Sequence, residues 1–425
     1  MSNFLRSISA LCVLLAASGI AVGSTSTMLF AKEENSRMRW KEKRIEIAIS
    51  RSLLESSPSI KSGSDVEGAI RRSINAWQNV LPIELVTVDS SRQDVSPAGI
   101  AGDGVNLITI AANPENINFF GKDPFSASAR SRIFYSKRGF ITEADIVLNP
   151  FQLFSTDGSF GTVDLESTLR HEIGHLLGLR HSKVVGAVMY GSAIKNGLFG
   201  GGNALAGPVD TDIAALRSLY GPVESGEDCC GSIAGTITGI GRSGTVFNVW
   251  VKDAASGRVV ASTTSERNRS FRIDGLGVGE YAVYAAVSGR KTKSSVQLLD
   301  LVEVKKGSTA RLSANYARRQ IDFSLELMGM NGILSDSPII VDRGSEQLIY
   351  AGGTNVTAER IRIESDSPFV TVNSDSIQNI LFESDVTGVV FEMNVADDTP
   401  PGQYNILAVA ADGSSDIRIG AITVR

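Results

Sequence analysis

The chain lacks an excess of charge of either sign. Its 425 residues carry 41 Lys and Arg against 46 Asp and Glu, a formal net charge of −5. This balance provides no basic surface for nucleic acid and no general attraction to anionic lipid. A membrane-spanning run is lacking too, because the N-terminal apolar run from Ile8 to Val22 is too short. With Arg6 before it and small residues behind it, this run predicts a secretory signal peptide cleaved near Gly23.

Cysteine is scarce, with three residues in the whole chain. Cys12 lies in the apolar N-terminal run and should leave with the signal peptide. The other two, Cys229 and Cys230, are adjacent and cannot close a loop between them. A vicinal disulfide, two free thiols and an intermolecular link all remain open. Two adjacent thiols without neighbouring Cys or His make a poor zinc site, so no chemistry is assigned to them.

Histidine is equally scarce, yet all three histidines fall in one short segment, His171 to His181, with the sequence HEIGHLLGLRH. On a helix, His171 and His175 are four residues apart and share one face, so both imidazoles can bind one ion. Glu172 lies one position further round the helix. From there it can take a proton from a metal-bound water, which is the role of a general base.

The end of this helix supplies the third ligand. Gly178 is expected to adopt the left-handed conformation that ends a helix in a sharp turn. The turn brings His181 towards the other two histidines. Three imidazoles leave the fourth tetrahedral position to water, the arrangement of a catalytic zinc. The sequence therefore predicts one catalytic Zn²⁺ bound by His171, His175 and His181.

The pattern HExxHxxGxxH resembles the zinc signature of the metzincin metallopeptidases. Ser182 directly follows the third histidine, and Met189 lies in an Ala-Val-Met-Tyr segment similar to the Met-turn of the matrixin branch. The segment from Asp212 to Gly221 is similar to the last helix of a matrixin domain. This resemblance implies a two-lobed α/β metzincin (zincin-like) domain that acts as a zinc endopeptidase. It also implies that Met189 forms an apolar floor beneath the metal.

The chain departs from the matrixin pattern in three respects. It has no further histidine, so the second, structural zinc site of many vertebrate matrixins is not expected. No cysteine-bearing propeptide motif precedes the domain, so latency through a thiolate is not expected either. Tyr190 is adjacent to Met189 rather than two residues beyond it, so it is not expected to be a fifth ligand.

The periodicity predicts the elements of the matrixin-like domain, which we place at residues 39–222 after a signal peptide (1–23) and a short segment (24–38). A capping box at Ser64 to Glu67 should open a helix that runs to Trp77, and Asp164 should open the zinc helix. Strands are expected at residues 45–49, 83–88, 105–111, 131–135 and 144–148. Substrate is expected to lie along residues 144–148 as an edge strand, with the Gly-rich segment 191–207 shaping the pocket for the residue after the cleaved bond.

The rest of the chain predicts two all-β sandwich domains after a turn-rich, acidic linker at 223–230. The first, 231–318, should have strands at residues 232–238, 246–252, 259–263, 270–273 and 281–286. Its segment from Gly275 to Tyr281 resembles the hairpin of carboxypeptidase-regulatory-like modules. The second, 319–425, contains a segment from Asp397 to Asn405 that resembles the late turn and strand of bacterial immunoglobulin-like (Ig-like) repeats.

Calcium is a further candidate cofactor, but no motif supports it. The loop aspartates that offer ligands are Asp366, Asp375, Asp385, Asp397 and Asp398. They lack the spacing of an EF-hand, and loop aspartates of this kind are more often solvated or turn-forming.

These observations predict a secreted, extracellular zinc endopeptidase that acts on proteins or peptides and contacts neither nucleic acid nor the membrane interior. The C-terminal modules are candidates for contact with a cell surface or extracellular matrix. The alternative is a surface adhesin or matrix-binding protein in which these modules do the main work and the peptidase domain is auxiliary or inactive.

Overall fold

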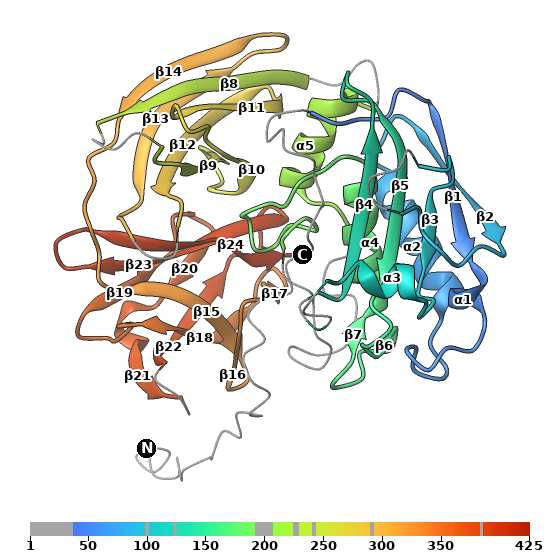
Figure 1. Cartoon of the computed structure of the whole chain (residues 1–425). Helices are drawn as coiled ribbons and strands as arrows, with labels where there is room; N and C mark the ends of the chain where they lie inside the picture. Colours follow the sequence, from blue (N-terminus) through green and yellow to red (C-terminus); the bar gives the residue numbers. More distant parts are fainter. Residues whose placement is uncertain are drawn as a thin grey trace.

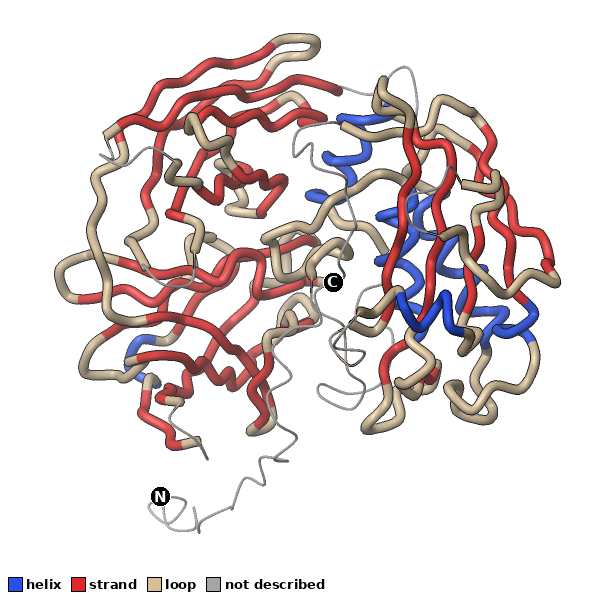
Figure 2. The backbone as a smooth tube through the Cα atoms, viewed as in Figure 1, coloured by secondary structure: helices blue, strands red, loops and turns tan. Residues whose placement is uncertain are grey.

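Helices are almost confined to one side of the molecule, whereas strands occur on both sides. The computed structural model describes residues 37–97, 102–121, 125, 127–191, 207–223, 229–239, 244–289, 293–382 and 386–425. Figure 2 shows that almost all helix lies on one side, in the first half of the chain, while the other side is built of strands. The predicted signal peptide lies outside the described residues, as does most of the Gly-rich segment 191–207.

The first half of the chain forms a five-stranded sheet in the order β2-β1-β3-β5-β4. The strands are β1 (Arg44–Ser50), β2 (Glu84–Ser90), β3 (Leu107–Thr109), β4 (Ala129–Tyr135) and β5 (Ile141–Leu148). Only β4 runs antiparallel to its neighbour. The strands lie where the sequence predicts them, but the expectation that residues 144–148 form an edge strand is wrong. Because β5 pairs with β3 and β4, it is an inner strand, and the strand at this edge of the sheet is β4.

Two long helices pack on this sheet (Figure 1). They are α2 (Val66–Gln78) and α4 (Leu165–Leu176). Helix α4 begins where the sequence predicts, because Asp164 accepts a hydrogen bond from the Ser167 N–H. The capping box predicted at Ser64 to Glu67 is not formed, because the cap of α2 is Asp65, which accepts a hydrogen bond from the Gly68 N–H. Trp77 lies between the helices and donates from Nε1 to the Arg170 carbonyl at 2.7 Å. The short elements α1 (Arg51–Leu54), α3 (Pro114–Asn118), β6 (Phe154–Ser155) and β7 (Val163–Asp164) were not predicted.

Helix α5 (Asp210–Tyr220) joins the two sides of the molecule. Figure 1 shows it between the helical side and the strands β8 and β11. Leu216 belongs to the core around α2 and α4, whereas Ala214 belongs to the core of the strands that follow. The Tyr220 hydroxyl also donates to the Leu177 carbonyl at 2.8 Å. One helix therefore contributes to two hydrophobic cores.

The strands from β8 to β14 form two facing layers. One layer is β11-β8-β14, and the other is β13-β12-β9-β10. The five strands predicted here are all present, and two further strands complete the layers. Their bounds are β8 (Cys229–Thr238), β9 (Phe247–Asp253), β10 (Val259–Thr264), β11 (Ser270–Gly277), β12 (Gly279–Val287), β13 (Gln297–Val304) and β14 (Thr309–Asn315).

Among the described residues of 324–425, the regular elements are strands, apart from one short 3-10 turn at Ser374–Ser376. One sheet has the order β16-β15-β18-β22-β20, with β21 also paired to β22. The strands β19, β23, β24 and β17 instead extend the sheet of the preceding region, because β10 pairs with β23 at Val259 and Gln403. A single sheet thus crosses from one predicted module to the next. The bounds are β15 (Ser324–Met330), β16 (Ile333–Ser335), β17 (Ile339–Val341), β18 (Glu346–Thr354), β19 (Ile361–Glu364), β20 (Val370–Val372), β21 (Gln378–Leu381), β22 (Thr387–Val395), β23 (Gly402–Ala410) and β24 (Ser415–Val424).

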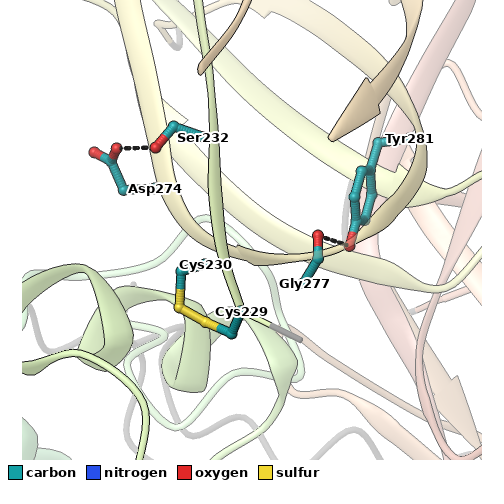
Figure 3. Close-up of a disulfide and its surroundings, with 6 residues drawn as sticks. All are labelled: Cys229, Cys230, Ser232, Asp274, Gly277 and Tyr281. Atoms are coloured by element: carbon teal, nitrogen blue, oxygen red, sulfur yellow. Dashed lines mark hydrogen bonds between the residues drawn. A yellow bond between two sulfur atoms is a disulfide. The ribbon is translucent and has the colours of Figure 1, made fainter. Parts of the chain in front are cut away.

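The two adjacent cysteines form a vicinal disulfide, one of the three alternatives that the sequence leaves open. Figure 3 shows it at the start of β8, beside a helix. Cys229 and Cys230 are therefore part of β8, and this strand begins before residue 231. Beyond the disulfide, Ser232 donates to the Asp274 carboxylate, and this bond ties β8 to β11.

Candidate metal centre and active site

The three histidines converge on one point. His171 and His175 project from α4, and the Nε2 atom of His181 lies 3.3 Å from that of His171 and 3.2 Å from that of His175. A tetrahedral zinc with Zn–N bonds of about 2.05 Å holds its ligand nitrogens about 3.3 Å apart. Within the part of the chain that the structure describes, these three residues are the one group of His, Cys, Asp or Glu close enough to hold a metal. The donor set fits zinc.

The second ring nitrogen fixes the orientation of two of the histidines. His171 donates from Nδ1 to the Val188 carbonyl at 2.7 Å, and His175 donates from Nδ1 to the Leu179 carbonyl at 2.8 Å. With the proton on Nδ1, the lone pair of Nε2 points into the shared site. Hydrogen bonds of this kind set the tautomer and the ring orientation of metal-binding histidines.

The surroundings keep two of these rings neutral. Burial, with a smaller contribution from His171, lowers the pKa of His181 to about 3. Burial followed by the proximity of His171 and His181 holds the pKa of His175 well below its usual range. A neutral imidazole is the form that binds a metal ion, so these two rings need not lose a proton before they bind one.

Helix α4 ends as the sequence predicts. Gly178 has a φ of +89°, which suits only a residue without a side chain, and its N–H bonds to the His175 carbonyl. The backbone of Met38 adds a second reason for glycine, because a Cβ at residue 178 would lie 2.3 Å from the Met38 carbonyl oxygen. The chain then reverses and brings His181 back to the helix.

Met189 lies against α4 between the two helical histidines. Its side chain is buried, and a Cβ on Gly174 would lie only 2.2 Å from its Sδ. Gly174 therefore provides the space that lets the methionine approach the helix. No role for Gly174 was predicted from the sequence, although its place between His171 and His175 in HEIGH was the available signal.

Glu172 lies beside the edge strand. Its carboxylate is 2 % exposed, and Ser131 of β4 donates from Oγ to Oε2 at 2.5 Å. Ser131 is itself fully buried. No sequence pattern pointed to Ser131, because the contact joins positions 41 residues apart. The hydrogen bond between Ser131 and Glu172 places β4 beside α4, the helix that carries His171 and His175.

The family model described as matrixin matches residues 39–221. Residues 39–221 are a matrixin domain. The match ends at the residue that follows α5, so the strands from β8 onwards lie outside it.

Curated relatives of the matrixin domain come from animals and plants. Interstitial collagenase of Oryctolagus cuniculus is 28% identical over 164 residues, which cover 39% of this chain and 30% of that protein. Metalloendoproteinase 1-MMP of Arabidopsis thaliana is 30% identical over 201 residues, 44% of this chain and 46% of that protein. The chain thus spans less than half the length of either relative.

A solved structure, the major pilin subunit of Bacillus cereus, is similar over 44% of this chain and 66% of that chain. Its identity is 12% and its TM-score 0.16, too low to carry an argument about the fold.

Within the matrixin domain, Asp212 of α5 holds the Met-turn. Its carboxylate accepts hydrogen bonds from the backbone N–H groups of Val188 (2.9 Å), Met189 (3.2 Å) and Val209 (3.1 Å). Burial raises its pKa to about 6, against the lowering effect of these three bonds. Asp212 was predicted from the sequence to lie at the start of the last helix, but its hydrogen bonds to Val188 and Met189 were not predicted.

The aspartates considered for calcium are scattered in the C-terminal half. Asp366 forms an ion pair with Lys252 at 2.9 Å and so links the last region to β9. Asp385 lies outside the described residues. Asp375, Asp397 and Asp398 are not part of any metal-binding group within the described residues.

Proposed function

We propose that the chain is a zinc-dependent endopeptidase in which His171, His175 and His181 hold the metal and Glu172 is the general base. The observation that carries the proposal is the convergence of three imidazole Nε2 atoms, 3.2 and 3.3 Å apart, next to a buried glutamate in a matrixin domain. The low identity to the relatives, and their greater length, make the activity of the whole chain part of this proposal.

The protein residues divide the work of hydrolysis. His171, His175 and His181 would hold a zinc ion, whose Lewis acidity would polarise the scissile carbonyl and lower the pKa of a water molecule. Glu172 accepts the proton of the attacking water and delivers it to the leaving amine. Ser131 holds one oxygen of the Glu172 carboxylate by a hydrogen bond and so keeps the base turned towards the site. Met189 and Gly174 keep the space behind the histidines apolar.

The substrate is expected to bind along β4. This strand ends the sheet order, and Ser131 places it beside Glu172. An extended peptide can therefore add to its free edge by main-chain hydrogen bonds, as in other cases of strand addition. The residue after the cleaved bond would enter a pocket shaped by the segment 191–207, most of which lies outside the described residues.

The proposed location is extracellular, which follows from the signal peptide expected at residues 1–23 and from the secreted character of matrixins. No helix in the described ranges is long and apolar enough to cross a membrane. Proteins and peptides are the proposed substrates. The matrixin match does not favour the alternative of an adhesin with an idle peptidase domain.

The decisive experiment compares the wild-type chain with Glu172→Gln. We expect one zinc per chain in both proteins, because the glutamate is not a ligand. Cleavage of fluorescent casein should fall by a factor of about 10² to 10⁴ in the variant, since general base catalysis contributes that much. Zinc content is measured by elemental analysis of the purified chain without residues 1–23.

His175→Ala is the companion variant, and it should lose zinc and cleavage together. A chelator should abolish wild-type cleavage, and added zinc should restore it. Full activity of Glu172→Gln would refute the assignment of the base. Absence of zinc from folded wild-type protein would refute the whole proposal.

A further inference from the structure

The strands of the C-terminal half cover the loop that joins His181 to Met189. The Val185 N–H bonds to the Ile419 carbonyl at 2.7 Å, and the Gly186 N–H bonds to the Gly420 carbonyl at 3.0 Å. Both acceptors lie in β24, the last strand of the chain. The loop is therefore tied to the C-terminus by main-chain bonds, although more than two hundred residues separate them.

The same loop contributes side chains to a hydrophobic cluster of the tail, by which we mean residues 229–425. Val184 and Ala187 are both buried, and they lie in one cluster with Trp250, Val259 and Ile419. These three tail residues come from β9, β10 and β24. Removal of the tail would expose this face of the loop to water, so its present conformation depends on the covering strands.

The fit between the two surfaces leaves no room for a side chain at Gly186. A Cβ there would lie 2.7 Å from Gln403 Cγ, 2.7 Å from Thr423 Oγ1 and 3.0 Å from the Gly420 carbonyl oxygen. All three atoms belong to β23 or β24. On the opposite side, a Cβ on Gly420 would lie 2.4 Å from Val184 Cγ1. Both surfaces thus use glycine at the point of closest approach.

A second contact holds the start of α5, at the other end of the Met-turn region. Arg258 Nε lies 2.9 Å from Asp210 Oδ2, an ion pair without hydrogen-bond geometry, and Arg258 also donates to the Pro401 carbonyl. Further along the helix, Gly275 of β11 lies so close to α5 that a Cβ would be 2.1 Å from the Ala214 carbonyl oxygen. The tail therefore contacts both the loop and α5, the helix that carries Asp212.

The covered loop leads directly to the metal ligands. The Val188 carbonyl, which orients His171, follows Ala187, and Ala187 is buried against the tail. The Ser182 N–H, next to His181, bonds to the Met189 carbonyl at 2.7 Å. A shift of the loop would move both the carbonyl partner of one ligand and the position of another. Loss of such a supporting partner typically weakens metal binding by about 10- to 100-fold.

We propose that the tail is a structural support of the zinc centre: β24 and the residues around it hold the His181–Met189 loop in the conformation that binds metal. The inference rests on the proposed zinc site and adds residues of the tail to it as positioning residues. The tail would then act on catalysis from beneath the metal, without contact with the substrate.

The test introduces Gly186→Ala into the full-length chain, with Glu172→Gln in the background of every protein to prevent self-digestion. The φ of Gly186 does not require glycine, and the three atoms nearest to the added methyl group all belong to the tail. We expect the zinc dissociation constant, measured by competition with a chelator, to rise about 10- to 100-fold. Removing two of the colliding groups, with Gln403→Ala and Thr423→Ala, should restore part of the affinity.

Two further variants complete the design. Gly279→Ala is the matched control, since the nearest atoms to its Cβ all belong to Tyr281 of the same strand, at an ordinary contact distance of 3.7 Å. It should leave zinc affinity unchanged. Ile419→Ala removes apolar contacts on the tail side of the interface and introduces no steric clash. It should also weaken zinc binding, but by less than Gly186→Ala does.

The results separate this inference from the proposed activity. If Gly186→Ala and Ile419→Ala both bind zinc as tightly as the background protein, the tail does not support the site and the inference is wrong. If zinc binding depends on these residues but the wild-type chain cleaves no protein, the support stands and the peptidase proposal fails.

Discussion

The two sides of the proposed zinc site are built in different ways. On one side, His171 and His175 belong to a single helix, whose own geometry places both rings on one face. On the other side, His181 and Met189 belong to an irregular loop that is held by Asp212, by the carbonyl contacts of its own backbone and by β24. The first side is determined by neighbours in sequence, and the second by partners that include residues more than two hundred positions away.

This difference implies that the two sides should respond differently to mutation. The helical side rests on a large core around Trp77, Leu169 and Ile173, in which a single contact is a small fraction of the whole. The loop side depends on a few polar groups and one apolar cluster. Local stability varies across a structure in just this way, and the segments with fewer supports open first.

The largest effect is expected from Asp212→Ala, which removes the acceptor of three backbone N–H groups. Each buried N–H that loses its partner costs about 1–3 kcal/mol, so we expect a loss of about 4 kcal/mol in the free energy of unfolding. Asp212→Asn keeps one acceptor oxygen and should lose less. Urea unfolding of the metal-free proteins measures both values.

Ser218→Ala is the control for α5, because its hydroxyl bonds only to the Ala215 carbonyl within the same helix. It should change the unfolding free energy by less than about 1 kcal/mol. If Asp212→Ala is no more harmful than this control, the loop side has other supports of similar strength and the contrast between the two sides is incorrect.

The helical side was predictable from sequence for the same reason that it is robust. Three predicted features depend on residues within a few positions of one another: the cap at Asp164, the spacing of His171 and His175, and the end of the helix at Gly178. The strands of the sheet were predictable from their alternation, but their order was not, which is why β5 was mistaken for the edge strand.

The contacts that complete the site were not predictable. Ser131 with Glu172, Asp212 with the Met-turn and β24 with the loop all join residues that are distant in sequence. The same holds for the sheet that passes from β10 to β23, since two separately patterned regions give no sign that their strands pair. A period of two identifies a strand but does not identify its partner.

Asp145 of β5 allows a second test of the comparison, because its buried carboxylate also accepts hydrogen bonds from backbone N–H groups, as that of Asp212 does. It accepts hydrogen bonds from the Ser96 and Leu107 N–H groups, and burial raises its pKa to about 7. This value exceeds that of an unfolded aspartate, about 3.9. Between these values the folded state keeps a proton that the unfolded state releases, so stability falls as the pH rises. The loss is absent below about pH 4 and complete above about pH 7.

Asp145→Asn removes this titration while keeping one acceptor. We expect the unfolding free energy of the wild type, relative to that of the variant, to fall by on the order of 3 kcal/mol between pH 4 and pH 8. Unfolding in urea at a series of pH values, without metal, gives this difference directly. A difference that stays constant with pH would show that the carboxyl is ionised in the folded protein and that water reaches it.

Ser131→Ala has the smallest expected effect. It removes the hydrogen bond between the edge strand β4 and Glu172, the proposed base. The hydroxyl donates to Glu172 but does not contact the histidine nitrogens. We expect kcat to fall about tenfold, equivalent to about 1.4 kcal/mol, with KM and zinc affinity unchanged. Ser131→Thr retains the hydroxyl and should recover most of kcat. A fall in zinc affinity, or a failure of threonine to recover kcat, would mean that residue 131 acts through packing of β4 against α4. The increase in kcat from Ser131→Ala to Ser131→Thr therefore measures how much Glu172 of α4 depends on a hydrogen-bond partner outside its own helix.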